Sequence, residues 1–280
     1  MDGLEEISRY GMRDYFRDEF NTIDELGTEG RVLGGWDIHN KQYVVSTQKN
    51  VTLSSSYYNT LSFDEGPKGW TSFFSYKPDQ MFSVRNKFYT LKDGKLWRHY
   101  SDSVNRGNFY GTDNNTSITF IFNPKISVSK NFQTINYEGS NGWKVSSFIS
   151  DSTGKNQFNN GSYTNSQDTT NEVKSYYGGE YVINPADNQP VVRADYNSVL
   201  GTYSPALIKY YAGFNRKENK YFAQLKNNST IRESEILNGR AMSGIKGFFA
   251  TVTISTDSVT DVGGAKELFA VSANYVESSY

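Results

Sequence analysis

The sequence predicts a mainly β protein, with antiparallel β-sandwich or propeller-like units that follow a short N-terminal helix. Aromatic residues make up 15% of the 280 residues, including 21 Tyr and 18 Phe, and these residue types favour strands. Short apolar segments alternate with Gly, Pro, Asn and Asp at close intervals between residues 51 and 149, which is typical of strands and turns. No long helical period separates these segments, so antiparallel pairing is favoured over βαβ units.

The helix is expected at the start of the chain. Apolar residues at positions 4, 7, 12, 15, 16 and 20 follow the helical period, with charges between them. Gly11 weakens the middle of this pattern, because glycine is a poor helix former. Together with the polar connection behind it, the pattern predicts a helical entry segment over residues 1–30.

Residues 31–149 are predicted to form an antiparallel β domain. Its first two strands surround a turn at residues 37–41, and Asp93-Gly94 lies between two alternating segments. The Asp-Gly pair is the strongest hairpin signal in the chain. Further strands are expected in "SITFIFNP", "FQTINYEG" and "WKVSSFIS".

The rest of the chain divides into a polar stretch and a second β segment. Residues 150–180 are rich in Asn, Ser and Thr, which predicts an exposed loop or a linker. Residues 181–280 are expected to add β structure to the same core, with a hairpin turn at 216–219. The last strands are expected in "SGIKGFFATVTIST" and "KELFAVSANYVESSY".

Composition excludes several functional classes. The chain has 29 Lys and Arg against 30 Asp and Glu, so no strong field attracts nucleic acid or an anionic membrane. It contains no Cys, hence no disulfide and no thiolate ligand or nucleophile. No signal-peptide pattern is present, and no stretch approaches the roughly 18 apolar residues of a membrane span.

Catalytic and cofactor motifs are not found either. The two histidines, His39 and His99, lie far apart in the sequence and are too few for a zinc site without Cys. Glycine-rich segments lack the residues of a P-loop, and no Ser-His-Asp pattern is present. The sequence therefore predicts no cofactor, no metal and no enzymatic activity.

The segment "TLSFDEGPKGWTSFFSYKPDQ", residues 60–80, has three interpretations. Asp64 and Glu65 could act as a glycosidase pair, but neighbours on a strand point to opposite faces. The favoured role for Asp64 is to bond turn amides before Gly66-Pro67. Trp70 and the alternating aromatics could stack on sugars, yet their alternation favours core packing or a subunit interface.

Eight residues are predicted to serve folding or interfaces rather than catalysis. Gly244 and Gly247 are expected where the backbone turns tightly or approaches another segment closely. The full set is Asp64, Gly66, Pro67, Trp70, Trp97, Trp143, Gly244 and Gly247.

Several sequence segments are informative because they occur together and in a particular order. They are "LEEISRYGMRDYFRD", "LGGWDIHNKQYVVS", "LSFDEGPKGWTSFFSYKPD", "KFYTLKDGKLWRHY", "NFYG", "KNFQTINYEGSNGW" and "SGIKGFFATVTIST…KELFAVSANYVESSY". This combination resembles virion structural proteins of tailed bacteriophages, in particular the muzzle or nozzle-like tail proteins of crAss-like and related short-tailed phages. The resemblance covers most of the chain outside 150–180 and corresponds to the C-terminal portion of those longer proteins.

The resemblance implies a non-enzymatic virion protein, made in the cytoplasm of the bacterial host and incorporated into the phage tail. It implies a subunit or fragment of a homo-oligomeric ring around the DNA-ejection channel. The implied partners are other tail proteins and passing phage DNA, bound without sequence specificity. Two alternatives stay open: a receptor module at the tail tip that binds a host glycan, and a glycan depolymerase.

Overall fold

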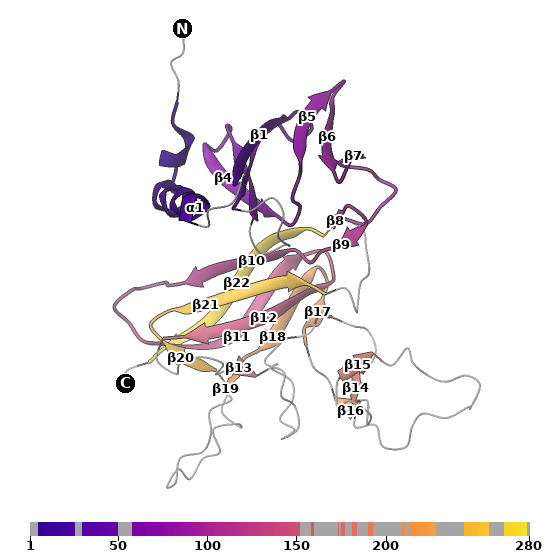
Figure 1. The fold of residues 1–280 in the computed structure, drawn as a ribbon. Helices are drawn as coiled ribbons and strands as arrows, with labels where there is room; N and C mark the ends of the chain where they lie inside the picture. Colours follow the sequence, from indigo (N-terminus) through magenta and orange to yellow (C-terminus); the bar gives the residue numbers. More distant parts are fainter. Residues whose placement is uncertain are drawn as a thin grey trace, which may run out of the picture. The chain divides into compact units, whose positions relative to one another are not determined.

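A computed structural model describes most of the chain and divides it into two compact units, Met1–Asn114 and Asn115–Tyr280 (Figure 1). We call them unit 1 and unit 2. Their boundary falls within the range 31–149 that the sequence groups as one domain, because the strands after residue 115 pair with the C-terminal strands. The described residues are 5–25, 30–49, 58–151, 158–159, 173, 175–176, 181–183, 190–192, 209–210, 213–227, 244–257 and 266–278.

The N-terminal helix of unit 1 is shorter than the sequence predicts and begins later. A 3-10 turn, η1 (Ile7–Arg9), precedes helix α1 (Arg13–Glu25). Gly11 separates them with a φ of 80°, a left-handed conformation that interrupts a right-handed helix. Gly11 thus breaks the predicted continuous helix instead of weakening it. Asp14 lies in the first turn of α1, where a negative charge is favoured by the helix dipole.

Four antiparallel strands form the first sheet of unit 1, which we call sheet A. The predicted hairpin around residues 37–41 is confirmed, and the Asp37 carboxylate accepts a hydrogen bond from the His39 N–H at 2.9 Å. The strands lie in the order β1 (Arg31–Asp37), β2 (Gln42–Gln48), β3 (Tyr58–Asp64) and β4 (Gly69–Phe74).

A three-stranded sheet, sheet B, completes the main body of unit 1. The hairpin predicted at Asp93-Gly94 is confirmed, and both residues have positive φ, 50° and 71°. Two positive φ values are what a type I′ turn requires. Sheet B contains β5 (Gln80–Val84), β6 (Lys87–Lys92) and β7 (Lys95–Arg98), and a short pair follows, β8 (Asn108–Phe109) with β9 (Thr112–Asp113).

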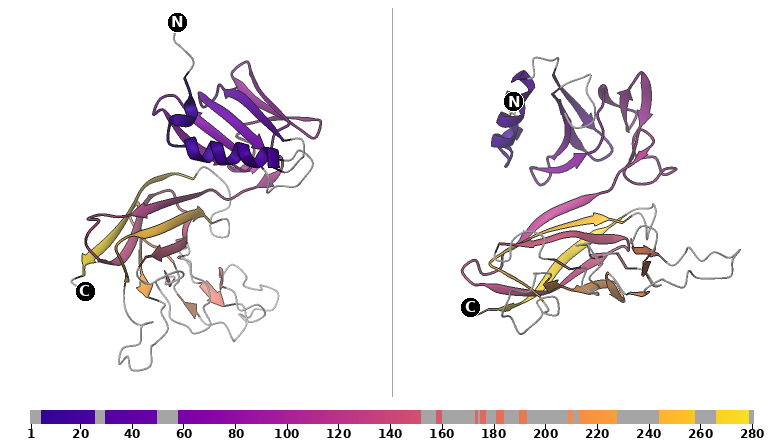
Figure 2. Two further views of the ribbon diagram at one scale, coloured as in Figure 1. Left: turned by 60° about the vertical axis from the view of Figure 1, so that its left-hand side comes forward. Right: turned by 60° about the horizontal axis from the view of Figure 1, so that its bottom comes forward.

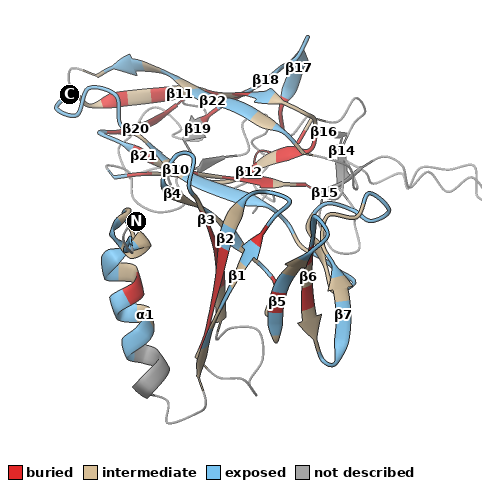
Figure 3. Cartoon of the chain, turned by 90° about the horizontal axis from the view of Figure 1, so that it is seen from above, coloured by how far each residue is buried: buried red, intermediate tan, exposed pale blue. Residues whose placement is uncertain are grey.

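Unit 1 has three layers: α1, sheet A and sheet B, as Figure 3 shows. On the helix side, the ring of Phe16 lies 4.7 Å from that of Trp70. On the other side, Val44 packs with Met81 and Phe88 of sheet B. A side chain at Gly35 would lie 2.5 Å from Met81 Cγ, so this glycine permits the close approach of β1 to sheet B.

Unit 2 contains two larger sheets, which we call sheet D and sheet E (Figure 2). Sheet D has the order β10 (Ser117–Phe122), β21 (Ala250–Thr256), β12 (Trp143–Ser150). Sheet E has the order β17 (Asn215–Lys217), β18 (Lys220–Gln224), β11 (Lys130–Gly139), β20 (Ile245–Gly247), and β22 (Leu268–Glu277) also pairs with β11. Short strands are β13 (Phe158–Asn159) with β19 (Lys226–Asn227), and β14 (Tyr181–Ile183) with β15 (Pro190–Val192) and β16 (Lys209–Tyr210).

Side chains from both sheets meet in one buried cluster of unit 2. Phe132 and Ile135 come from sheet E, and Phe148, Val252 and Ile254 come from sheet D. All pairings between named strands are antiparallel, which confirms the predicted class of mainly antiparallel β with a short N-terminal helix. Most of the polar stretch 150–180 lies outside the described residues. Among the helices that are described, none has the length and apolar character needed to cross a membrane.

Candidate functional site

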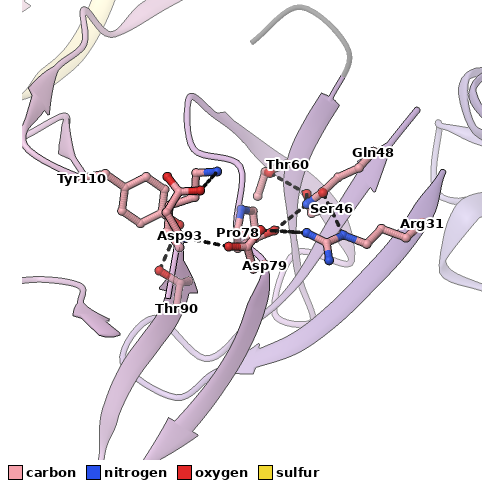
Figure 4. A network of polar contacts seen from close by, with 10 residues as sticks. Arg31, Ser46, Gln48, Thr60, Pro78, Asp79, Thr90, Asp93 and Tyr110 are labelled. Atoms are coloured by element: carbon pink, nitrogen blue, oxygen red, sulfur yellow. Dashed lines mark hydrogen bonds and ion pairs between the residues drawn. The ribbon is translucent and has the colours of Figure 1, made fainter. Parts of the chain in front are cut away.

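A polar network joins sheet A to sheet B in unit 1 (Figure 4). Arg31 at the start of β1 donates from Nε to Gln48 Oε1 and from Nη2 to Asp79 Oδ1, both at 2.9 Å. Gln48 donates in turn to the carbonyl oxygen of Pro78 at 2.6 Å. Asp79 Oδ2 accepts the backbone N–H of Asp93 at 2.7 Å. A single carboxylate therefore ties the first strand to the β6–β7 turn.

The charge on Asp79 is stabilised by this geometry. Partial burial works against ionisation, but the Asp93 N–H and the Arg31 guanidinium outweigh it and lower the pKa of the carboxyl. Arg31 and Asp79 keep about a third of their side-chain surface exposed, 34% and 37%. Water screens such a pair, so it contributes only about 1 kcal/mol to stability.

His99 lies in an aromatic cluster beside this network. Its ring is 4.9 Å from that of Tyr76 and 5.1 Å from that of Phe88, and its Nε2 is 2.8 Å from Thr90 Oγ1. Tyr110 donates its hydroxyl to the same Thr90 oxygen at 3.0 Å. Burial lowers the pKa of His99 to about 4 and raises the pKa of Tyr110 to about 12. Both groups are therefore neutral at pH 7 and support the fold.

A buried carboxylate, that of Asp37, anchors the first turn of sheet A. Asp37 is 1% exposed and accepts the hydroxyl of Tyr100 at 2.5 Å. Asn40 donates to the same hydroxyl oxygen at 2.8 Å, and the ring of His39 stacks on that of Tyr100 with centroids 4.3 Å apart. Burial and the Asp37 carboxylate raise the pKa of Tyr100. This tyrosine fixes the turn to the loop after β7.

A surface hollow of about 220 Å³ adjoins the aromatic cluster. Trp97 and Tyr110 contribute aromatic walls, with rings 5.4 Å apart, and Arg98 and Arg106 also line it. The Trp97 indole nitrogen is buried without a hydrogen-bond partner. This hollow is smaller than most ligand pockets, which occupy roughly 300 to 1,000 Å³. Within the described ranges, no group of three or more Asp, Glu or His side chains is arranged to hold a metal ion.

Five of the residues singled out from the sequence lie in unit 1. Asp64 ends β3 and accepts the Gly66 N–H at 2.8 Å, which is the turn bond expected at this position. Gly66 and Pro67 are exposed in that turn. Trp70 packs under α1, and Trp97 lies at the hollow described above. The turn and the hollow are separate features of the unit.

The other three lie inside unit 2. Trp143 is 4% exposed and donates its indole N–H to the carbonyl oxygen of Glu267 at 3.1 Å. Gly244 has a φ of 92°, and a side chain there would lie 2.0 Å from Asn131 Oδ1. At Gly247 it would lie 2.6 Å from Asp151 Oδ1. The burial of Trp143 fits a role in packing, and the two glycines lie where the backbone approaches other residues closely.

Several structural anchors carry no signal in the sequence. Arg31 and Asp79 are 48 residues apart, and no local motif links them. Lys130 is fully buried, and its ammonium donates to the carbonyl oxygens of Val128 at 2.7 Å and Phe248 at 2.5 Å. A lysine in a strand ordinarily faces water, so only the tertiary structure reveals this position.

Comparison with known proteins identifies one region of the chain. Residues 104–228 match the profile of the Crassvirus muzzle protein C-terminal domain. The muzzle protein of Bacteroides phage crAss001 is 34% identical over 94 residues, which is 33% of this chain and 7% of that protein. The resemblance to muzzle proteins of crAss-like phages is thus confirmed, in the part of the chain that contains β10, β11 and β12. The extent differs from the expectation, because the matched residues 104–228 include the polar stretch 150–180 and leave out the first 103 residues and the last 52.

Proposed function

We propose, from the similarity of residues 104–228 to the muzzle protein C-terminal domain, that the chain is a non-enzymatic structural component of a phage tail. It acts as a subunit or fragment of a ring around the DNA-ejection channel. Its partners are further copies, other tail proteins and the passing DNA, which it contacts without reading sequence. It is made in the host cytoplasm and incorporated into the virion.

The match to the muzzle domain is the observation that carries this proposal. The physical properties of the chain support it. Each unit contains antiparallel sheets packed through buried apolar clusters, and such packed layers make stiff building blocks. The formal charge is −1, so the chain as a whole offers little net attraction for passing DNA.

The test is to locate the chain in purified virions. Mass spectrometry of gradient-purified particles is expected to find its peptides, and gold-labelled antibodies against it are expected to bind the tail. Cryo-electron microscopy of the same particles then gives its position relative to the channel. Absence from virions, or labelling confined to the capsid, would contradict the proposal.

Glycan binding is the second candidate, because Trp97 and Tyr110 line a hollow beside two arginines. In that case a host-glycan array would show binding that Trp97→Ala abolishes. The matched control is Trp36→Ala, since Trp36 is an exposed tryptophan on β1 of the same unit. Equal binding by both variants, or none by the native chain, argues against a receptor role.

A further inference from the structure

Among the described strands of unit 2, β22 forms a long open edge of sheet E. β22 runs over ten residues and pairs with β11 along nearly its whole length. No other strand in the described part of the chain pairs with β22. An open edge presents a row of backbone N–H and C=O groups that can pair with another strand.

β22 also lacks the features with which proteins usually protect such edges. Charged side chains, Pro and very short strands discourage edge pairing. Leu268 to Val276 includes neither a charged residue nor a proline, and Glu277 carries the one charge of the strand. By contrast, the opposite end of sheet E is the three-residue strand β17, which contains Arg216 and Lys217.

Apolar side chains lie along the exposed face of the same strand. Phe269 is 74% exposed and Val276 is 53% exposed. Between them, Ser272 and Asn274 are exposed, while Val271, Ala273 and Tyr275 turn toward the core and stay only partly buried. A strand added at this edge would complete the cover of these half-buried residues.

The edge of sheet D on the same side of the unit has a similar character. β10 pairs only with β21 among the described strands, and its six residues, Ser117–Phe122, contain no charge. Its Ile118 and Ile121 are 48% and 62% exposed. An ion pair between Lys125, just after β10, and Glu277 places the ends of the two edge strands next to each other. Figure 1 shows both strands on this border of the unit.

We propose that this side of unit 2 binds a second copy of the chain by edge-to-edge strand addition, with β22 running antiparallel to β22 of the partner. A second copy fits because two identical uncharged edges do not repel each other, and cross-strand pairing of apolar side chains is favourable. The edge strands β22 and β10 belong to different sheets but lie on the same side of unit 2. A single two-fold contact between two copies can therefore extend both sheets.

This contact is independent of the proposed ring. A two-fold contact closes on itself, whereas a ring needs a heterologous contact between different surfaces. If the strand addition is disproved, the proposed tail role is unaffected. If the tail role is disproved, the proposed strand addition is likewise unaffected.

Single cysteines test the contact directly, because the chain has no Cys of its own. Oxidation of the Ser272→Cys chain is expected to give disulfide-linked dimers in high yield, since position 272 is exposed and is the fifth of the ten residues of β22. The control is Gln224→Cys, at an exposed position of β18, which is expected to stay monomeric on a non-reducing gel. Equal yields from both variants would overturn the proposal.

A charge on the edge provides the second test. Val276→Lys is expected to convert the dimer to a monomer in analytical ultracentrifugation, because a charged side chain on an edge strand discourages pairing with another strand. Gln224→Lys is the matched control and is expected to leave the mass unchanged, and circular dichroism checks the fold of both. A native chain that is monomeric at all concentrations, or a mass that Val276→Lys leaves unchanged, would contradict strand addition.

Discussion

The indole N–H of Trp70 donates a hydrogen bond to the carbonyl oxygen of Ile7, with the two atoms 3.2 Å apart. The ring of Trp70 also lies 4.7 Å from Phe16 of α1 and 5.4 Å from Phe63 of β3. One side chain of sheet A thus holds both η1 and α1, the two pieces that Gly11 separates. Two further ring contacts join this layer to sheet A, Tyr10 with Phe63 and Tyr15 with Phe73.

Removing the Trp70 hydrogen bond is expected to loosen the N-terminal segment. In Trp70→Phe an aromatic ring still packs on Phe16, but the Ile7 carbonyl loses its donor, at a cost of about 1 kcal/mol. Hydrogen exchange of peptides from residues 5–25 should show faster exchange, while peptides from unit 2 stay unchanged. Trp36→Phe, at an exposed position, is the control. Unaltered exchange in the N-terminal peptides would contradict the role of the bond.

Acid is expected to destabilise unit 1 through His99. Burial lowers the pKa of its imidazole from 6.5 to about 4, so the unfolded chain binds a proton at a higher pH than the folded chain does. The stabilisation is complete above pH 6.5 and is lost as the pH falls toward 4, by about 3 kcal/mol in all. Urea unfolding from pH 7 to 4 measures this loss.

The variant His99→Gln isolates this effect. Without the imidazole, the decline in stability between pH 6.5 and 4 should become shallower. Asp79 scarcely affects this comparison, because its pKa is lowered from 3.8 and its stabilisation is lost mainly below that pH, in both proteins alike. Equal slopes for His99→Gln and the native chain would rule out His99 as the cause.

Substitution of Gly244 is expected to disrupt sheet E. Gly244→Ala combines a φ of 92° with a Cβ only 2.0 Å from Asn131 Oδ1 and 2.9 Å from the Phe132 carbonyl oxygen. Backbone strain and the clash together should cost more than about 2 kcal/mol. Gly94→Ala has a φ of 71° but open space around the site, and so should cost only about 1 kcal/mol. Chemical denaturation, followed by hydrogen exchange, measures the free energy of unfolding that each variant loses. Similar losses in the two variants would contradict the prediction.

The muzzle-like region is expected to need the C-terminal strands in order to fold. Residues 104–228 contain β10 and β12, but β21 lies between these two strands and begins at Ala250. A fragment of residues 104–228 should therefore show narrow amide dispersion in NMR spectra. A fragment of residues 115–280 should show the wide dispersion of a folded β protein. A well-dispersed spectrum from the shorter fragment would mean that its strands pair differently when alone.

Local signals in the sequence predict much of the fold. Asp93-Gly94 specifies a hairpin because both positions need positive φ, and Asp64 closes its turn through its own carboxylate. The start of α1 is less predictable, because helical periodicity continues across Gly11 while the backbone does not. Trp143 is buried, and no neighbouring residue in the sequence indicates that its indole N–H donates to the Glu267 carbonyl oxygen.

Sequence alone therefore determines the class of the protein, its turns and most of its strands, since these depend on neighbours a few residues apart. The tertiary structure decides which strands pair. β11 and β12 are consecutive, yet they belong to different sheets, and each pairs with a C-terminal strand. The tertiary structure also decides that Arg31 bonds to Asp79 and that Lys130 is buried. These contacts bring together segments far apart in the chain, and they form only when an apolar core offsets the entropy lost on joining them.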